Sequence, residues 1–148
     1  MSDKPGRATI LVVDDEVALR QLLARQLRAE GYNVVEAGYG GEALAVADSS
    51  EEPIDLVLSD IIMPGMVGTE LAQRLLSEHP GIRVVLMSAH PLHRVTTSGS
   101  GATEVPVLPK PFDGRKMLAF VELVLNTSTG TEDGARDDLA PVSESSKN

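Results

Sequence analysis

Apolar runs alternate with amphipathic stretches along most of the chain. Several runs are rich in β-branched residues, and their length is typical of strands. The first, third and fourth runs are nearly continuous in Val, Leu and Ile, as expected for parallel strands that are covered on both faces. The predicted strands are Thr9–Val13, Asn33–Ala37, Ile54–Ser59, Arg83–Met87 and Val105–Leu108.

The stretches between these runs carry apolar residues at helical spacing. In Val17–Ala29, the leucines at positions 19, 22, 23 and 27 recur every three or four residues, which predicts a helix with one buried face. Further helices are predicted over Glu42–Ala47, Thr69–Ser77 and Lys116–Leu125. Strands that alternate with helices in this way predict an α/β fold with a doubly wound parallel sheet.

The segment between the fourth and fifth strands interrupts the alternation. It reads PLHRVTTSGSGATE, where Pro91 can start a helix but Val95–Thr97 is a β-branched run and Ser98–Gly101 lacks helix formers. Helix propensity is poor throughout, so the sequence predicts a short or frayed fourth helix there.

Composition divides the chain into one domain with two polar ends. We expect a flexible N-terminus over residues 1–8, a single domain over 9–126, and a disordered acidic tail over 127–148 that is rich in Ser, Thr, Asp and Gly. These divisions leave no room for a separate DNA-binding or catalytic domain.

The charge and the residue types present exclude several classes of protein. A formal net charge of −9 argues against direct binding to nucleic acid or to an anionic membrane, because both require a basic face. No apolar run approaches the roughly 20 residues of a membrane span, and the N-terminus lacks the apolar centre of a secretory signal. The chain has no cysteine, which excludes disulfides and thiolate metal sites. A cytoplasmic protein is therefore expected.

Polar residues follow four of the predicted strands at the point where each strand ends. Asp14 and Asp15 follow the first strand, Asp60 the third, Ser88 the fourth and Lys110 the fifth. The carboxyl ends of parallel strands share one edge of the sheet, where ligands bind in folds of this kind. Three carboxylates, a hydroxyl and an ammonium are therefore predicted to converge. Each of them alone has an ordinary explanation, such as a helix cap or a turn, but all five at one edge predict a site.

The chemistry of this group favours a divalent cation and a phosphoryl group. Three close carboxylates repel one another, so that they either raise a pKa or bind a cation. Oxygen ligands alone favour Mg²⁺ over zinc. A metal opposite a lysine suits a phosphoryl group, and a carboxylate can itself be the nucleophile. Asp60 is the best candidate nucleophile because it lies between the acid pair and the Ser88–Lys110 pair.

These motifs together resemble the response-regulator receiver domain of two-component signalling. The resemblance runs from about Thr9 to Leu125 and depends on Asp14-Asp15, on DIIMPGMVG with Pro64 and Gly68, on Ser88-Ala89 and on Lys110-Pro111-Phe112. It implies a flavodoxin-like fold with five parallel strands in the order 2-1-3-4-5. It also implies that the protein acts as a phosphoacceptor in a phosphorelay, and as an enzyme only in assisting its own phosphorylation and dephosphorylation.

The resemblance also implies a role for each site residue. Asp60 would accept a phosphoryl group from a histidine kinase or a histidine phosphotransfer protein. A further, downstream protein would then bind the phosphorylated domain. Ser88 would be the switch hydroxyl, Lys110 the counter-charge of the phosphate, and the Lys110–Pro111 bond would be cis. The implied Mg²⁺ ligands are Asp14, Asp15, Asp60 and the backbone carbonyl of Ile62.

One residue departs from the family pattern, and three other functions remain open. Receivers usually carry an aromatic residue three positions before the lysine, where this chain has Val107, which has no ring to swing inward. A receiver-like binding module that does not use phosphorylation is one alternative. A Mg²⁺-dependent phosphohydrolase is another, although such enzymes generally carry a second acid where this chain has Ile62. The third is a dinucleotide-binding protein, because Gly38–Ala43 fits the glycine-rich fingerprint.

Overall fold

A computed structural model of the chain describes residues 7–90, 94–97 and 103–127. Most of the predicted flexible N-terminus and of the predicted acidic tail lies outside the described residues. Thr127, the first residue assigned to that tail, is only 9% exposed, and its carbonyl accepts a hydrogen bond from the Arg83 guanidinium.

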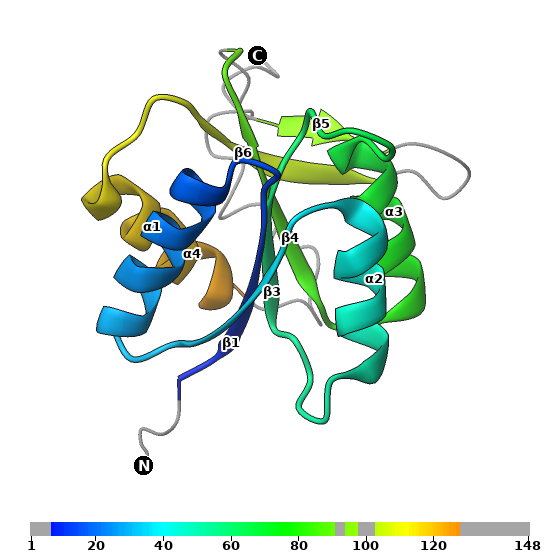
Figure 1. The fold of residues 1–148 in the computed structure, drawn as a ribbon, viewed down its shortest axis with the longest axis horizontal. Helices are drawn as coiled ribbons and strands as arrows, with labels where there is room; N and C mark the ends of the chain where they lie inside the picture. Colours follow the sequence, from blue (N-terminus) through cyan, green and yellow to red (C-terminus); the bar gives the residue numbers. More distant parts are fainter. Residues whose placement is uncertain (1–6, 91–93, 98–102, 128–148) are drawn as a thin grey trace.

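The described residues form a twisted sheet between two pairs of helices (Figure 1). The strands lie in the order β2-β1-β3-β4-β6-β5, and all neighbours are parallel except β5 and β6. The predicted order of five parallel strands is therefore confirmed, with β6 in the fifth place. The strands are β1 (Thr9–Val13), β2 (Asn33–Ala37), β3 (Leu56–Asp60), β4 (Arg83–Ser88), β5 (Arg94–Thr96) and β6 (Glu104–Pro109). The helices are α1 (Val17–Ala29), α2 (Gly40–Ser49), α3 (Gly68–Glu78) and α4 (Gly114–Leu125).

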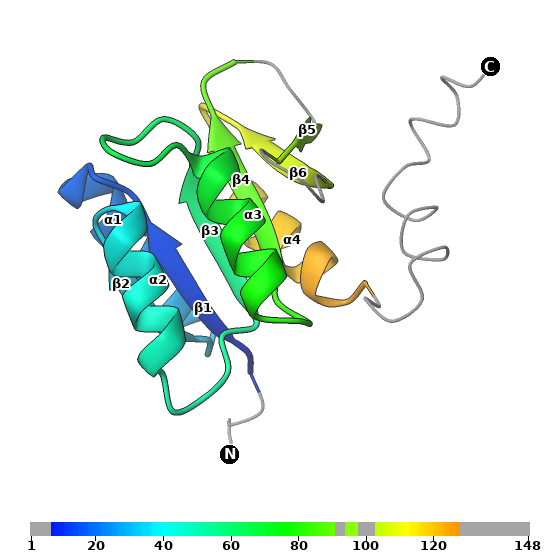
Figure 2. The ribbon, with the colours of Figure 1, turned by 90° about the vertical axis from the view of Figure 1, so that its right-hand side faces the viewer.

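Each face of the sheet is covered by one pair of helices. Helices α1 and α4 lie on one face and α2 and α3 on the other (Figures 1 and 2). The inner strand β1 is buried on both faces, since Ile10 to Val13 are all 0% exposed. Burying an aliphatic side chain contributes about 1.5–3 kcal/mol, so the continuous apolar strands drive the formation of this sheet. On the predicted apolar face of α1, Leu23 and Leu27 are buried, whereas Leu22 is 42% exposed.

The segment between β4 and β6 does not contain the predicted short helix where the structure describes it. Residues Arg94–Thr96 instead form β5, which pairs antiparallel with β6 through Val95 and Val105. The β-branched run favours an extended backbone, and β6 offers it an unpaired edge. Residues 91–93 and 98–102 lie outside the described part of the chain, so the correction applies to 94–97.

Among the described residues, no helix is both long enough and apolar enough to cross a membrane.

Candidate functional site

All five polar residues selected from the sequence lie at the carboxyl edge of the sheet. Asp60 is the last residue of β3 and Ser88 the last residue of β4. Asp14 and Asp15 follow β1 directly, and Lys110 follows β6. The register brings these ends level, since Asp60 is paired with Met87 and Ser88 with Pro109. Residues separated by nearly a hundred positions therefore meet at one site.

The three carboxylates form a compact acidic cluster. Asp14, Asp15 and Asp60 each contribute a side-chain oxygen, and these three oxygens lie within 4.8 Å of one another. The three residues differ in exposure: Asp14 is buried, Asp60 is half-buried and Asp15 is exposed. The cluster therefore has a buried base and an open side through which an ion and a substrate can enter.

Asp14 is held by the protein at every polar atom except one. Its backbone N–H donates to the Ala37 carbonyl at 3.1 Å, and its carbonyl accepts from the Arg20 guanidinium at 2.9 Å. Its Oδ1 accepts from the backbone N–H of Glu16 at 2.9 Å. The remaining oxygen, Oδ2, is buried and has no hydrogen-bond partner. A buried polar atom without a partner costs about 1–3 kcal/mol, so a cation or a water molecule bound at this oxygen would stabilise the fold.

The electrostatics of the cluster favour a cation. Burial raises the pKa of Asp14, and the neighbouring charges of Asp60 and Asp15 raise it further. The Glu16 N–H and the Lys110 ammonium oppose this increase in pKa. A hard divalent cation would relieve the repulsion between the carboxylates and would give Asp14 Oδ2 a partner. The oxygen atoms of this cluster therefore fit the ligands that a Mg²⁺ ion prefers.

The positive group of the site faces the central carboxylate. Lys110 Nζ lies 3.2 Å from Asp60 Oδ1, and the two side chains are 25% and 16% exposed, respectively. The lysine is held at the end of β6, where its backbone N–H donates to the Ser88 carbonyl at 2.6 Å, and the Lys110–Pro111 bond is cis as expected. The Ser88 hydroxyl accepts from the backbone N–H of His90 at 3.0 Å, so its own proton is available to a further acceptor.

The loop after Asp60 passes close to the start of α3. The Gly68 N–H donates to the Ile61 carbonyl at 2.6 Å, and a Cβ on Gly68 would lie only 2.5 Å from the Asp60 carbonyl oxygen. The Ile62 side chain is 71% exposed and contributes no acid or base. The absence of a carboxylate at position 62 weakens the phosphohydrolase alternative. Whether the Ile62 carbonyl is a metal ligand stays a prediction.

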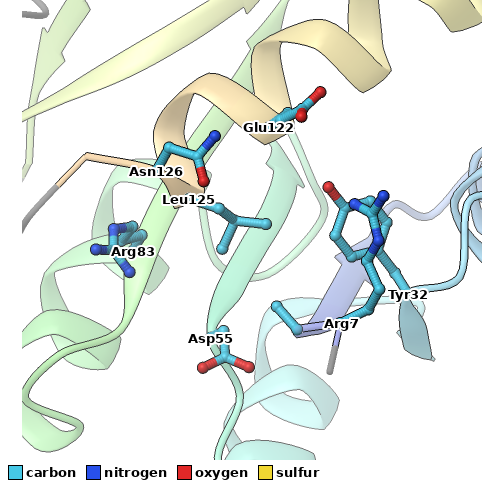
Figure 3. Close-up of a pocket in the computed structure, with 8 residues that line it drawn as sticks. Arg7, Tyr32, Asp55, Arg83, Glu122, Leu125 and Asn126 are labelled. Atoms are coloured by element: carbon cyan, nitrogen blue, oxygen red, sulfur yellow. The ribbon is translucent and has the colours of Figure 1, made fainter. Parts of the chain in front are cut away.

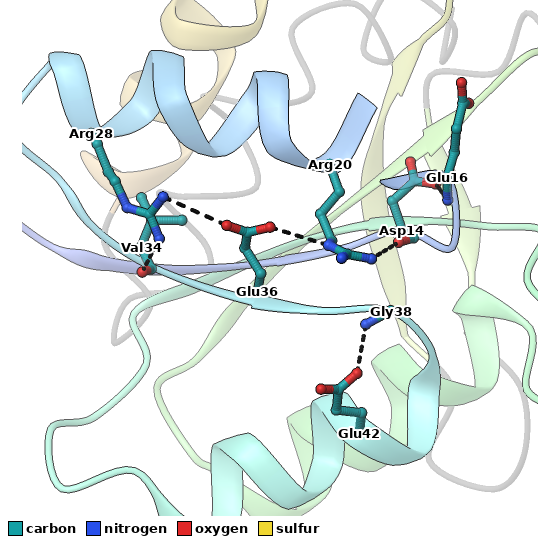
Figure 4. Close-up of polar contacts among 8 residues, drawn as sticks. All are labelled: Asp14, Glu16, Arg20, Arg28, Val34, Glu36, Gly38 and Glu42. Carbon is teal, nitrogen blue, oxygen red and sulfur yellow. Dashed lines mark hydrogen bonds and ion pairs between the residues drawn. The ribbon is translucent and has the colours of Figure 1, made fainter. Parts of the chain in front are cut away.

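The glycine-rich segment after β2 does not resemble a phosphate cradle. The Gly38 N–H donates to Glu42 Oε1 at 2.8 Å, so a carboxylate already occupies the place where a pyrophosphate oxygen would accept (Figure 4). A pyrophosphate there would also lie at the same edge as three carboxylates. The structure therefore favours the metal interpretation of this edge over dinucleotide binding.

A second group of possible metal ligands lies at the other ends of two helices. Asp48, Glu78 and His79 come from the ends of α2 and α3, and Asp48 and Glu78 are exposed. His79 Nε2 lies 3.0 Å from Asp48 Oδ1. This contact links the two helices, and we interpret the group as structural.

A cavity of about 300 Å³ lies at the amino-terminal end of the sheet. Figure 3 shows Arg83 on one side of it and Arg7 beside Tyr32 on the other, with Leu125 between them. The Arg7 guanidinium lies 4.8 Å from the centre of the Tyr32 ring. Asp55, which also lines the cavity, accepts the backbone N–H of Thr9 at 2.8 Å. These contacts link residues at the starts of β1, β2 and β3, at the opposite end of the sheet from the acidic cluster.

Sequence reasoning missed two residues next to the acidic cluster, Arg20 and Glu36. The Arg20 Nε lies 3.1 Å from Glu36 Oε1, and the same guanidinium donates to Asp14. In the sequence, Arg20 is one of three arginines between positions 20 and 28, and nothing marks it as different. Only its position six residues after Asp14, in the first turn of the predicted helix Val17–Ala29, could have indicated the contact.

Comparison with known proteins agrees with this geometry. The family model described as the response regulator receiver domain matches residues 10–122. The chain is 34% identical over 124 residues to the sensor kinase CckA of Brucella abortus, covering 84% of this chain and 13% of that protein. It is 33% identical over 130 residues to TcrX, a probable transcriptional regulatory protein of Mycobacterium tuberculosis, covering 86% of this chain and 55% of that protein. The chain therefore spans only part of these relatives.

Solved structures show the same fold. The response regulator TrrA of Thermotoga maritima, in complex with Mg²⁺ and BeF, matches with a TM-score of 0.67 and 33% identity over 79% of this chain and 98% of that one. A structure of the histidine kinase ThkA in complex with TrrA matches with a TM-score of 0.66 and 33% identity, covering 80% of this chain and 99% of that chain.

Proposed function

Because this chain belongs to the response regulator receiver domain family, we propose that it is a phosphoacceptor in a phosphorelay, with Asp60 as the residue phosphorylated. Receiver domains of this family are signalling modules of two-component systems. The observation that carries the proposal is the cluster at the carboxyl edge, where three carboxylate oxygens lie within 4.8 Å of one another and Lys110 Nζ lies 3.2 Å from Asp60 Oδ1.

The proposed reaction is a phosphoryl transfer to a carboxylate. An oxygen of Asp60 attacks the phosphorus of the donor, an O–P bond forms, and the bond from phosphorus to the donor's leaving group breaks. With a phosphohistidine donor, the imidazole nitrogen leaves with the electron pair. Lys110 then neutralises a phosphoryl oxygen and the Ser88 hydroxyl donates to another. Mg²⁺, held by the three aspartates and the Ile62 carbonyl, would shield the negative charges of the carboxylates and the phosphoryl group.

We further propose that the partners are proteins. The phosphoryl donor is a histidine kinase or a histidine phosphotransfer protein, and a downstream protein binds the phosphorylated domain. The complex of TrrA with the kinase ThkA supports the first part, since TrrA is a structural neighbour of this chain. A net charge of −9 agrees with protein partners rather than direct contact with nucleic acid.

Intact-protein mass spectrometry tests the proposal directly. After incubation with acetyl phosphate and Mg²⁺, we expect one phosphoryl adduct, which disappears when EDTA replaces Mg²⁺ and is absent from Asp60→Asn. The amide of asparagine cannot form the acyl phosphate, while its size leaves the fold intact. A folded protein that binds Mg²⁺ but takes no adduct would contradict the proposal and would favour the binding module that does not use phosphorylation.

Mg²⁺ is also expected to raise the melting temperature. A ligand present at tenfold its Kd, and bound only by the native state, stabilises that state by about 1.4 kcal/mol, which corresponds to a rise of several degrees. Differential scanning fluorimetry with MgCl₂ measures this rise. Asp15→Asn should remove most of it, because the variant loses one of the three anionic ligands without disturbing the core. An Asp15→Asn protein with the full rise would show that Asp15 is not a ligand.

A further inference from the structure

Arg20 joins the acid pair to the neighbouring strand. It lies in the first turns of α1, and its side chain is only 18% exposed. One guanidinium nitrogen donates to the Asp14 carbonyl at 2.9 Å, and Nε donates to Glu36 Oε1 on β2 at 3.1 Å (Figure 4). The guanidinium therefore bridges the loop that carries Asp14 and Asp15 and the strand beside it.

The Arg20 guanidinium contacts the backbone of the acid pair itself, at the Asp14 carbonyl. This carbonyl belongs to the peptide group between Asp14 and Asp15, so the contact restrains the backbone dihedral angles on both sides of that group, ψ of Asp14 and φ of Asp15. Asp14 is only 1% exposed, and among the described residues its carbonyl accepts its hydrogen bond from the Arg20 guanidinium. Without Arg20 the buried carbonyl would lack a partner, and the peptide group would rotate toward water to recover one.

A second arginine holds the anchor of this link in place. Arg28 lies 3.5 Å from the other carboxylate oxygen of Glu36, and its guanidinium donates to the Val34 carbonyl at 3.0 Å. On the opposite side, a Cβ on Gly38 would lie 3.2 Å from the Arg20 guanidinium. The guanidinium thus lies in a confined space between β2 and the loop after β1, where its neighbours restrict its position.

We propose that Arg20 is a positioning residue for the metal site, which it orders by holding the Asp14–Asp15 peptide group through the Glu36 anchor. The inference rests on the proposed function, because it assumes that Asp14 and Asp15 ligate Mg²⁺. Residues that orient metal ligands typically contribute a factor of 10–100 to metal affinity. A guanidinium suits this role, because its planar fork donates in two directions at once.

The sign of the effect separates this role from simple electrostatics. Arg20 carries a positive charge next to a cation site, so by charge alone its removal should strengthen Mg²⁺ binding. If Arg20 orders the ligands, its removal should weaken Mg²⁺ binding. The two explanations therefore predict opposite changes in Kd for the same substitution.

The test is a Mg²⁺ titration of ¹⁵N-labelled protein followed by amide chemical shifts. We expect Arg20→Gln to raise the Kd about tenfold. The matched control is Arg25→Gln, which removes the same charge from an exposed position of the same helix. Its Kd should stay within about twofold of wild type, or fall slightly. An unchanged or lower Kd in Arg20→Gln would overturn the proposal.

A second variant covers the case in which Arg20→Gln does not fold. Arg20→Lys keeps the charge but replaces the planar fork, in which separate nitrogens donate to Asp14 and Glu36, by a single nitrogen, so an increase in its Kd would come from geometry alone. A wild-type affinity in Arg20→Lys would contradict the bridging role.

The titration also separates this proposal from the proposed function. If the amide chemical shifts of the wild-type protein did not respond to Mg²⁺, both the proposed metal site and the proposed role of Arg20 would be wrong. A wild type that binds Mg²⁺, with Arg20→Gln unaffected, would overturn only the role of Arg20.

Discussion

Replacing Lys110 with methionine is expected to slow the phosphorylation of Asp60 by acetyl phosphate about a hundredfold while tightening the binding of Mg²⁺. Lys110 Nζ lies 3.2 Å from Asp60 Oδ1, where it can stabilise the charge that develops on the transferred phosphoryl group. The same ammonium offsets the charge of the carboxylates and opposes the increase in the pKa of Asp14. Its loss therefore leaves a more negative site, which attracts a divalent cation more strongly but stabilises the transition state less.

The rate of adduct formation by mass spectrometry and the Kd from a Mg²⁺ titration measure the two effects separately. Lys116→Met is the matched control, because it makes the same change in charge and size at an exposed position in the first turn of α4. This control should change neither quantity appreciably. A wild-type rate in Lys110→Met would show that Lys110 is not the counter-charge of the phosphate. Weaker Mg²⁺ binding in Lys110→Met would show that repulsion between the carboxylates does not control the affinity for Mg²⁺.

The residues of the site were predictable because strand ends follow from hydrophobicity. Apolar runs end abruptly before Asp14 and Lys110, and the geometry of parallel sheets brings such ends to one edge. The runs themselves identify buried strands without any knowledge of distant contacts. The helix α1 was predicted with its exact bounds, because its leucine stripe is long and regular.

The strand β5 was not predictable from the same rules. The alternation of strands and helices favoured a helix between β4 and β6, whereas the local residues around Val95 favoured an extended backbone. Pairing with β6 decides between the two, and that pairing depends on whether the edge of β6 is free in the folded protein. A sequence pattern carries no information on a free edge.

The difference between the two adjacent acids also required the structure. In the sequence, Asp14 and Asp15 are equivalent, but alternate side chains leave an extended backbone in opposite directions. Asp14 is consequently buried, with one oxygen lacking a partner, and Asp15 is exposed. The contact of Arg20 with the Asp14 carbonyl could not be predicted from the sequence either, because every residue has a backbone carbonyl.

Replacing Gly68 with alanine is expected to destabilise the domain by about 1–3 kcal/mol and to weaken Mg²⁺ binding as well. The added Cβ would lie 2.5 Å from the Asp60 carbonyl oxygen and 2.7 Å from Ile61 Cα, and both are backbone atoms at the end of β3. The clash cannot be relieved by rotating a side chain, so α3 and the end of β3 must separate. This movement displaces Asp60, the proposed phosphoacceptor, and breaks the hydrogen bond from the Gly68 N–H to the Ile61 carbonyl.

Chemical denaturation in urea, with and without Mg²⁺, measures both consequences. Gly41→Ala is the matched control, since it introduces the same Cβ into the first turn of α2, 3.4 Å from the nearest atom, which belongs to the Tyr39 side chain. An alanine inside a helix is favoured over glycine by about 0.5–1 kcal/mol, so the control should be as stable as wild type or more stable. If Gly68→Ala behaved like Gly41→Ala, the close approach of α3 to the end of β3 would not constrain the site. A loss confined to Gly68→Ala, and larger with Mg²⁺ than without it, would show that the glycine is required at position 68 both for the packing of α3 and for the placement of Asp60.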